Sequence, residues 1–201
     1  MTKEKSTLRC EWATKHQLEQ DYHDTEWGVP IYDDQKLFEM LCLESAQAGL
    51  SWLTILKKRE NFRKAFLDFE INKVANFSER KVEELLKNKG IIRNRLKIKA
   101  FINNANCVLK IQNSGQSFSD FLWDFVKHQP IQNSFKIASE VPAKTEISEK
   151  MSKSLKQHGF KFLGSTTCYA FMQSVGMTND HIVDCFRYEE IKSLNQHQNP
   201  N

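Results

Sequence analysis

A chain of 201 residues with 40% hydrophobic side chains can bury one sizeable core, and its length suits one domain or two tightly fused lobes. The net charge of +4 leans only mildly towards anionic partners and decides little by itself. No run of about 18 apolar residues occurs, which argues against a membrane span, and the polar start of the chain argues against a signal peptide.

Helical periodicity dominates the chain, and capping residues or glycines stand at the ends of several segments. The predicted helices span, in chain order, 35–44, 50–58, 78–86, 93–112, 119–127, 148–159 and 164–175, and a last one begins near residue 178. Segment 130–145 is predicted to be a loop. No segment alternates in the way that an open sheet requires, so the predicted fold class is all-α.

The ends of the chain differ from its middle in composition. We expect residues 1–9 to form a flexible N-terminus and residues 191–201 to form a disordered tail. Residues 10–190 lack an internal repeat or a long linker, and we expect them to form a single domain of two closely packed helical lobes.

The chain has an odd number of cysteines and no evident secretion signal, which argues against a disulfide framework. We therefore expect a cytoplasmic protein whose thiols are free or bound to metal. No four cysteines are closely spaced, which excludes an iron–sulfur centre. The five thiols belong to Cys10, Cys42, Cys107, Cys168 and Cys185.

His181 and Cys185 lie four residues apart in N-D-H-I-V-D-C. On a last helix beginning near Thr178, this spacing puts both side chains on one face, where they can hold one ion. Cys10 and His23 would complete a set of two thiolates and two imidazoles, which suits tetrahedral zinc. Spacing alone leaves open whether the two pairs meet, and a buried cysteine is often only a small apolar residue.

Glu44 follows Met40 by one turn in an otherwise apolar predicted helix. It is either buried and paired or it faces a cavity. Tyr22, Trp27 and Trp52 flank it in sequence, and aromatic faces with one carboxylate form a good site for a flat cationic ligand. The alternative is that Glu44 is exposed and the aromatic residues belong to the core.

Gly159 and Gly164 separate two predicted helices in H-G-F-K-F-L-G-S-T-T-C. A hairpin of this kind can aim backbone N–H groups at a phosphate, helped by the N-terminus of the second helix and by Lys161. A solvated face is the competing interpretation for most lysines, and glycine also ends ordinary helices. Further basic residues that could contact phosphates are Lys87, Lys89, Arg93, Arg95, Lys97, Lys99, Lys153 and Lys156.

Several long strings resemble, in the right order, the family of 3-methyladenine DNA glycosylase I. They include Y-H-D-T-E-W-G-V-P, L-F-E-M-L-C-L-E, Q-A-G-L-S-W-L-T-I-L-K-K-R-E, G-F-K-F-L-G, F-L-W-D-F-V, F-M-Q-S-V-G and N-D-H-I-V-D-C. The resemblance covers nearly the whole chain, from about Cys10 to Cys185. It implies a helix-hairpin-helix DNA glycosylase fold and a structural zinc ion that joins the two chain ends, bound by Cys10, His23, His181 and Cys185.

The resemblance also implies a pocket for a base. Glu44 would be the polar and catalytic contact, with Tyr22 and Trp52 as stacking walls. Gly49 and Leu50 would enter the gap left by the extruded nucleotide.

The hairpin has an implied role as well, since Gly159, Lys161 and Gly164 would grip the DNA backbone. One departure concerns the pocket, where relatives often carry a tyrosine three residues before the Tyr22 position and this chain has Glu19. That departure affects a secondary wall of the pocket.

The implied activity is the removal of 3-methyladenine from alkylated double-stranded DNA, a step of base-excision repair. The base is cationic while attached to deoxyribose, so its glycosidic bond is already weakened and the enzyme mainly extracts and recognises it. Flipping costs a few kcal/mol, and stacking returns about 1–3 kcal/mol per base. No lysine lies between Gly164 and His181, which predicts a monofunctional enzyme. Asp180 adjoins a predicted metal ligand and is not assigned as the catalyst.

Two other functions fit parts of the pattern. A non-enzymatic DNA-binding module with structural zinc would have an exposed Glu44 and no pocket between Tyr22 and Trp52. A zinc hydrolase needs an open metal position, which four protein ligands would close. For the glycosylase we expect a monomer with no obligatory protein partner and no membrane association.

Overall fold

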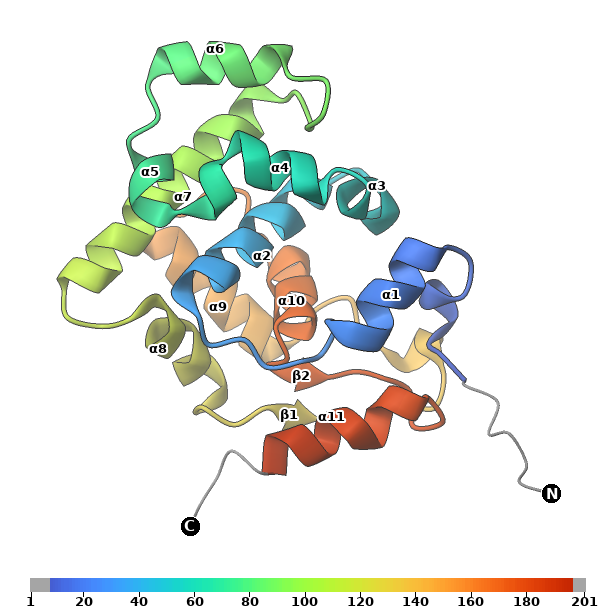
Figure 1. The fold of residues 1–201 in the computed structure, drawn as a ribbon. Helices are drawn as coiled ribbons and strands as arrows, with labels where there is room; N and C mark the ends of the chain where they lie inside the picture. The colour runs from blue at the N-terminus through green and yellow to red at the C-terminus, as the bar shows by residue number, and fades with distance from the viewer. Residues whose placement is uncertain (1–7, 197–201) are drawn as a thin grey trace.

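The structure is a computed structural model that describes residues 8–196. Helices make up most of it, as the sequence predicts (Figure 1). The α-helices are α1 (Gln17–Thr25), α2 (Asp34–Gln47), α3 (Trp52–Leu56), α4 (Arg59–Ala65), α5 (Ile71–Ala75), α6 (Glu79–Lys87), α7 (Arg95–Asn113), α8 (Phe118–Trp123), α9 (Glu146–Gln157), α10 (Ser165–Ser174) and α11 (Phe186–Gln196). Short 3-10 helices are η1 (Glu11–Ala13), η2 (Leu67–Phe69), η3 (Asp124–Val126) and η4 (Ala138–Glu140).

The central helix is α2, which is buried over every residue from 37 to 46. Such a helix has no solvent face, and α3, α7, α8 and α10 all pack against it. The Asp33 side chain caps its first turn by accepting a hydrogen bond from the Lys36 N–H. Because α2 is buried, each of its polar side chains must have a hydrogen-bond or ion-pair partner or must face a cavity.

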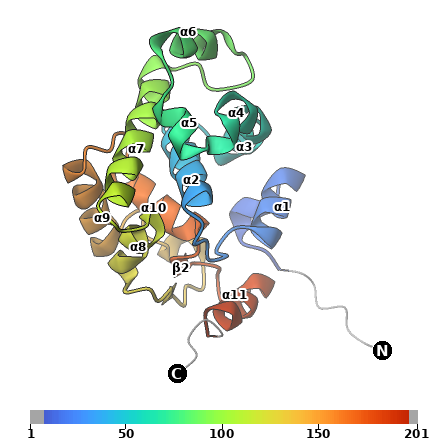
Figure 2. The same cartoon turned by 60° about the vertical axis from the view of Figure 1, so that its left-hand side comes forward.

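Helices pack on two sides of α2, and each of these two groups is referred to below as a lobe. In one lobe α5 packs along α7, and phenylalanine rings from η2, from α7 and from the residue after α4 form an aromatic core. Phe66 lies 5.7 Å from Phe69 and 5.1 Å from Phe101, measured between ring centroids. Helix α6 lies at the outer end of this lobe, and α11 lies at the opposite end of the molecule (Figures 1 and 2).

The second lobe contains the pair α9 and α10, which pack on each other and are joined by the segment 158–164. Helix α9 begins earlier than the sequence predicts. Thr145 is its N-cap, and Ser148 is the third helical residue of a reciprocal capping box. The predicted N-cap at Ser148 is therefore wrong by about one turn. Ser148 instead lies inside the first turn and exchanges hydrogen bonds with the true N-cap, Thr145.

The predicted last helix beginning near Thr178 is also wrong. Thr178–Asn179 forms strand β2, which pairs in parallel with β1 (Ile131–Gln132) inside the predicted loop. The pairing holds the backbone extended, so His181 and Cys185 lie in the turn before α11. Because the Cys185 N–H bonds the Ile182 carbonyl at 2.8 Å, that turn brings the two side chains to one site.

The described part of the N-terminal segment lies beside the start of α11. The Leu8 carbonyl accepts a hydrogen bond from the Phe186 N–H at 3.0 Å, and Arg9 forms an ion pair with Asp24. The tail expected from residue 191 begins, in the structure, within α11. The rest of the expected flexible ends, 1–7 and 197–201, lies outside the described residues. None of the described helices combines the length and the apolarity that crossing a membrane requires.

Candidate functional site

A cavity of about 430 Å³ lies between α1, α2, α3, α10 and the segment that follows β2. Tyr22, Glu44 and Trp52, which the sequence predicts to share a pocket, all line it. Its size falls within the usual range for sites that enclose a small organic ligand. The cavity thus brings together three residues from three separate helices.

Glu44 is buried, with 5% of its surface exposed, and burial raises the pKa of its carboxyl to about 8, although the neighbouring Ser174 acts in the opposite direction. Glu39, the other buried acid of α2, is neutralised by Arg59 and Arg63 at 2.8 and 2.9 Å. Glu44 forms no such ion pair in the described part of the chain. A buried carboxyl that faces a cavity without a cation is prepared to receive one.

The aromatic walls of the cavity carry polar atoms without partners. Tyr22 Oη and Trp52 Nε1 are both buried, and neither has a hydrogen-bond partner among residues 8–196. The two rings lie 5.3 Å apart at an interplanar angle of 53°. Leaving such groups unsatisfied costs about 1–3 kcal/mol each, so their position at the cavity wall indicates that a ligand completes them.

Asp180 lines the same cavity but differs from Glu44 in its contacts. Its carboxylate accepts hydrogen bonds from Tyr169 Oη at 2.6 Å and from Gln173 Nε2 at 2.8 Å. Asn133 and Thr178 donate to its other oxygen. These donors come from α10, from β2 and from the residue after β1, so the Asp180 carboxylate links these three segments.

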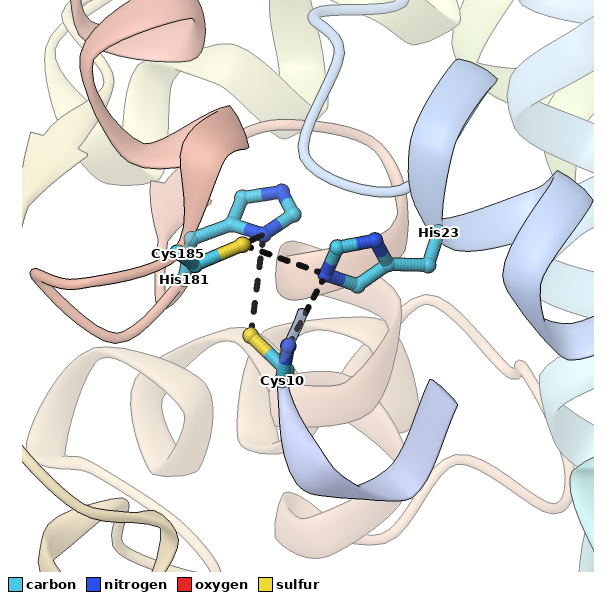
Figure 3. A group of neighbouring side chains, drawn as sticks. All are labelled: Cys10, His23, His181 and Cys185. Atoms are coloured by element: carbon cyan, nitrogen blue, oxygen red, sulfur yellow. Dashed lines mark hydrogen bonds between the residues drawn. The ribbon is translucent and has the colours of Figure 1, made fainter. Parts of the chain in front are cut away.

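Cys10, His23, His181 and Cys185 meet in one buried cluster (Figure 3). Cys185 Sγ lies 3.4 Å from His23 Nε2 and 3.5 Å from His181 Nδ1, and Cys10 Sγ lies 3.7 Å from His181 Nδ1. All four ligand atoms lie within 4.8 Å of one another. A zinc tetrahedron with bonds of about 2.0–2.3 Å has edges of about 3.3–3.8 Å, so the donor set and its spacing fit this ion.

Outer hydrogen bonds fix both imidazoles for ligation. His23 Nδ1 donates to Asp24 at 2.8 Å, and His181 Nε2 donates to the Trp27 carbonyl at 3.2 Å. Each ring therefore turns its other nitrogen, an acceptor, towards the sulfurs, and His23 Nε2 also accepts a hydrogen bond from the Cys10 N–H at 3.4 Å. Burial raises the pKa of Asp24, but hydrogen bonds from Arg9 and His23 outweigh it and lower the pKa overall, which keeps this carboxylate ionised.

The two thiols are coupled. A hydrogen bond from Cys10 lowers the pKa of Cys185 to about 2, while the same bond raises the pKa of Cys10. The neighbouring groups thus favour the thiolate form of Cys185, the form that ligates a metal. Four buried protein ligands leave no open position, which is typical of a structural metal site.

The metal cluster supports one wall of the cavity. The Trp27 ring lies 4.5 Å from the His181 ring, and Trp12 lies 5.5 Å from His23 and 6.3 Å from Tyr22, all measured between centroids. Both tryptophans line the cavity, as does Cys10. The joining of the chain ends therefore also positions α1 and its Tyr22.

The sequence profile of the methyladenine glycosylase family matches residues 12–188. The chain belongs to this family. It is 52% identical over 180 residues to DNA-3-methyladenine glycosylase 1 of Escherichia coli K12, an alignment that covers 90% of this chain and 96% of the relative.

Solved structures of methyladenine glycosylases share the fold. A crystal structure of 3-methyladenine DNA glycosylase I matches with a TM-score of 0.88 and 50% identity, over 89% of this chain and 98% of the other. A single-residue variant of 3-methyladenine DNA glycosylase I in complex with 3-methyladenine matches with a TM-score of 0.86 and 41% identity, over 89% and 96% of the two chains.

In this methyladenine glycosylase, a groove of about 240 Å³ continues from the cavity along Glu44 and Gln47. Gly49 and Leu50 line one side of the groove, and Thr166 of the first turn of α10 lines another. Gly49 adopts a φ of +81°, which favours glycine, and the Leu50 side chain is 40% exposed. The two residues predicted to enter DNA thus form a projecting turn beside the cavity.

The predicted DNA hairpin is held from α7 by a buried amide. Asn104 Oδ1 accepts a hydrogen bond from the Lys161 N–H at 2.8 Å, and its Nδ2 donates to the Lys161 carbonyl at 3.1 Å. Asn103 donates to the Gly159 carbonyl at 2.8 Å. Gly164 is the N-cap of α10 and supplies no side-chain cap, so the first N–H groups of α10 remain available. The Lys161 side chain is exposed.

The members of the basic run along 87–99 differ in their surroundings, since Lys87, Lys89 and Arg93 are exposed and the others are paired or buried. Arg95 pairs with Glu79 and Glu83, and Lys99 pairs with Glu79. Lys97 points inward, as described below. By contrast, no ion pair involving the hairpin lysines 153, 156 and 161 occurs in the described part of the chain, and these three are exposed.

Several residues of the site escaped the sequence analysis. Trp12 and Gln47 line the cavity, and Phe162 lies exposed in the hairpin with a φ of 59°. Glu19, which the sequence analysis did place at a secondary wall of the pocket, lines the cavity, half-buried and without an ion-pair partner in the described part of the chain. Trp12 stands two residues after Cys10, and that proximity to a predicted ligand was the one signal that could have identified it.

Proposed function

We propose that the protein is a monofunctional DNA glycosylase that hydrolyses the N-glycosidic bond of 3-methyladenine in alkylated double-stranded DNA. Family membership and the activity named for its relatives support this proposal. So does the structure of a relative in complex with 3-methyladenine. The observation that carries it is the buried, unpaired Glu44 in a cavity whose aromatic walls present two unsatisfied polar atoms.

The proposed mechanism uses the cavity as the receptor for a base turned out of the duplex. Tyr22 and Trp52 would stack on the base, and Glu44 would contact its edge. The positive charge of the bound base would favour the carboxylate form of Glu44, whose proton would leave to solvent. Glu44 would thus supply a charge-assisted contact that an unmodified, neutral base does not receive in full.

The bond change needs little acid catalysis. A water oxygen would form a bond to the anomeric carbon of the sugar while the bond from that carbon to the base breaks. The electron pair of the broken bond would neutralise the cationic base, and the attacking water would lose a proton to solvent. The contribution of the protein is extraction, orientation and electrostatic selection of the base.

We further propose that the ion of the cluster is zinc, with a structural role. The donor set of two thiols and two imidazoles, the tetrahedral spacing and the outer hydrogen bonds support this assignment. Bound zinc would clip the N- and C-terminal segments together. It takes no part in the bond change, because all four of its positions would be occupied by Cys10, His23, His181 and Cys185.

The pair α9 and α10 fits a helix-hairpin-helix element that grips DNA. We propose that Gly159, Lys161 and Gly164 contact the phosphate backbone and that Gly49 and Leu50 fill the space left by the flipped nucleotide. The exposure of Lys161 and Leu50 supports these roles, as does the groove that links the Gly49–Leu50 turn to α10.

The protein is proposed to act in the cytoplasm as a monomer that requires no protein partner. The cavity, the cluster and the hairpin all come from one chain, and the five cysteines are free thiols. The burial of Glu44 at a cavity favours a glycosylase over a non-enzymatic DNA-binding module. The closed ligand set favours it over a zinc hydrolase.

The test is incubation of the metal-loaded protein with double-stranded DNA that has been treated with a methylating agent, followed by identification of the released bases. We expect free 3-methyladenine and intact, abasic DNA strands. The Glu44→Gln variant is the matched control because it keeps the shape of the side chain and removes its charge. Release of no base by folded, metal-loaded protein would contradict the proposal.

A further inference from the structure

The C-terminal end of α2 is completed by a side chain from another helix. The last carbonyls of an α-helix lack partners within the helix. Here Lys97 Nζ donates to the carbonyl of Ala46 at 2.7 Å and to the carbonyl of Ala48, also at 2.7 Å. Lys97 is 8% exposed, although lysine is almost never buried without a specific partner.

The position of Lys97 within its own helix is unfavourable for a positive charge. Lys97 lies in the first turn of α7, after the N-cap Asn94. A cation there is disfavoured by the dipole of α7, and burial lowers the pKa of Lys97, which further disfavours its charge. At the end of α2 the charge has the favourable sign, and α2 has no basic residue in its own last turn.

The same end of α2 carries two functional features. Glu44 and Gln47 line the cavity just before it, and Gly49 and Leu50 project just after it. The turn between them is tight, because the Leu50 N–H donates to the Gln47 carbonyl at 2.6 Å. A Cβ atom at Gly49 would have nothing within 4 Å. Protein neighbours of Gly49 therefore do not explain the geometry of this turn, whereas Lys97 holds the backbone that enters it through the carbonyls of Ala46 and Ala48.

We propose that Lys97 is a positioning residue that holds the Gly49–Leu50 turn in the geometry needed to enter DNA, in fixed relation to Glu44. This inference rests on the proposed function. Lys97 fixes the turn through two carbonyl oxygens and offsets the negative end of the α2 dipole, which would otherwise face the phosphates. Its role is in taking the base out of the duplex, and the cavity itself does not need it.

Because Lys97 is proposed to act on entry into DNA and not on the cavity, two measurements can separate these roles. Binding of free 3-methyladenine, measured by isothermal titration calorimetry, reports on the cavity alone. Excision from methylated duplex DNA in single turnover reports on entry into DNA as well. For Lys97→Met we expect free-base affinity within about twofold of the unsubstituted protein and excision slower by roughly 10- to 100-fold, because misplacement of a positioning element has effects of that size.

Two further variants sharpen the test. Lys97→Arg keeps the charge and the donors and should restore most of the excision rate. Lys110→Met makes the same substitution in the last turn of α7, where the side chain is exposed, and should leave both readouts unchanged. If Lys97→Met does not fold, as judged by circular dichroism, Lys97→Gln carries the same test because it retains N–H donors without the charge.

The outcomes separate this inference from the proposed function. Unchanged excision by a folded Lys97→Met protein would overturn the positioning role. A parallel loss of free-base binding and excision would also overturn it, because Lys97 would then support the cavity itself. Failure of the unsubstituted protein to bind the free base and to excise it would instead contradict the proposed function.

Discussion

The cluster of Cys10, His23, His181 and Cys185 and the cavity at Glu44 are adjacent buried polar sites, and Cys10 belongs to both. They differ in whether their polar groups have hydrogen-bond partners. In the cluster, both imidazoles are oriented by an outer acceptor, and the neighbouring groups lower the pKa of Cys185. In the cavity, Tyr22 Oη and Trp52 Nε1 find no hydrogen-bond partner among the described residues, and Glu44 forms no ion pair with any of them. A buried polar site whose groups lack only an ion is typical of a structural site. A buried site whose hydrogen-bond donors lack acceptors is typical of a site that binds a ligand.

The largest expected effect tests the cluster. Cys185→Ser removes one of four ligands, and structural zinc contributes on the order of 10 kcal/mol to folding in small metal-dependent domains. We expect loss of bound zinc by elemental analysis and a drop of at least about 10 °C in melting temperature. The protein that remains folded should still excise the base.

Cys107→Ser is the matched control for this prediction. It also changes a buried thiol, but one outside the cluster, so it should keep the ion, and a chelator should lower its melting temperature as in the unsubstituted protein. The melting temperature of Cys185→Ser, which lacks the ion, should not respond to the chelator. An equal response of both variants to chelation would contradict the assignment of the metal site. Retention of one zinc per chain by Cys185→Ser would contradict it as well.

The next effect tests the charge in the cavity. Glu44→Gln should slow excision by about 10- to 150-fold, the value of one charge-assisted hydrogen bond. The pKa of Glu44 is raised from 4.5 to about 8, so folding of the free protein takes up a proton between these pH values. The free energy of unfolding contributed by Glu44 therefore falls as the pH rises through this window, and Glu44→Gln should lack this loss.

Excision should show the opposite pH dependence in the same window. A cationic base binds best to ionised Glu44, so excision at low DNA concentration should rise as the pH approaches about 8. In Glu44→Gln the profile should be flat. A pH profile that is identical in both proteins would mean that Glu44 does not titrate against the base.

A smaller effect is expected for the hydroxyl of Tyr22, and it distinguishes a group that contacts the ligand from one that stabilises the fold. Tyr22→Phe removes a hydroxyl that has no partner in the free protein, so the melting temperature should not fall, while excision should slow by about 2- to 10-fold. Tyr169→Phe removes a hydroxyl that donates to Asp180 at 2.6 Å and should lower the melting temperature. A lowered melting temperature for Tyr22→Phe would show that its hydroxyl supports the fold.

The smallest effect concerns the rim of the cavity. Glu19 is a half-buried carboxylate without an ion pair in the described residues, so it adds negative potential for a cationic base. Glu19→Gln should slow excision by about 2- to 5-fold at low salt, and the difference should disappear as salt screens the charge. Glu11→Gln, an exposed change outside the cavity, should have no effect. A salt-independent loss in Glu19→Gln would indicate a direct contact.

Sequence reasoning predicted the residues of the site better than their local structure. Periodicity identified α2 and α7 because apolar spacing reports burial, and the residue types of the cluster reported metal chemistry. The helix predicted to carry His181 and Cys185 was wrong, because the β1–β2 pairing depends on residues about 47 positions apart. Such long-range pairing leaves no local signal, and neither does the contact of Lys97 with Ala46.

The cluster has a consequence for the order of events during synthesis. Cys10 and His181 are 171 positions apart, so the ligand set is incomplete until almost the whole chain has left the ribosome. Metal can be held by all four ligands only at that stage, and the entropic penalty of closing so long a loop grows only with the logarithm of its length. Prematurely terminated chains would lack the C-terminal ligands, would remain open and would be exposed to proteolysis. The cluster can therefore stabilise the fold only once synthesis is nearly finished.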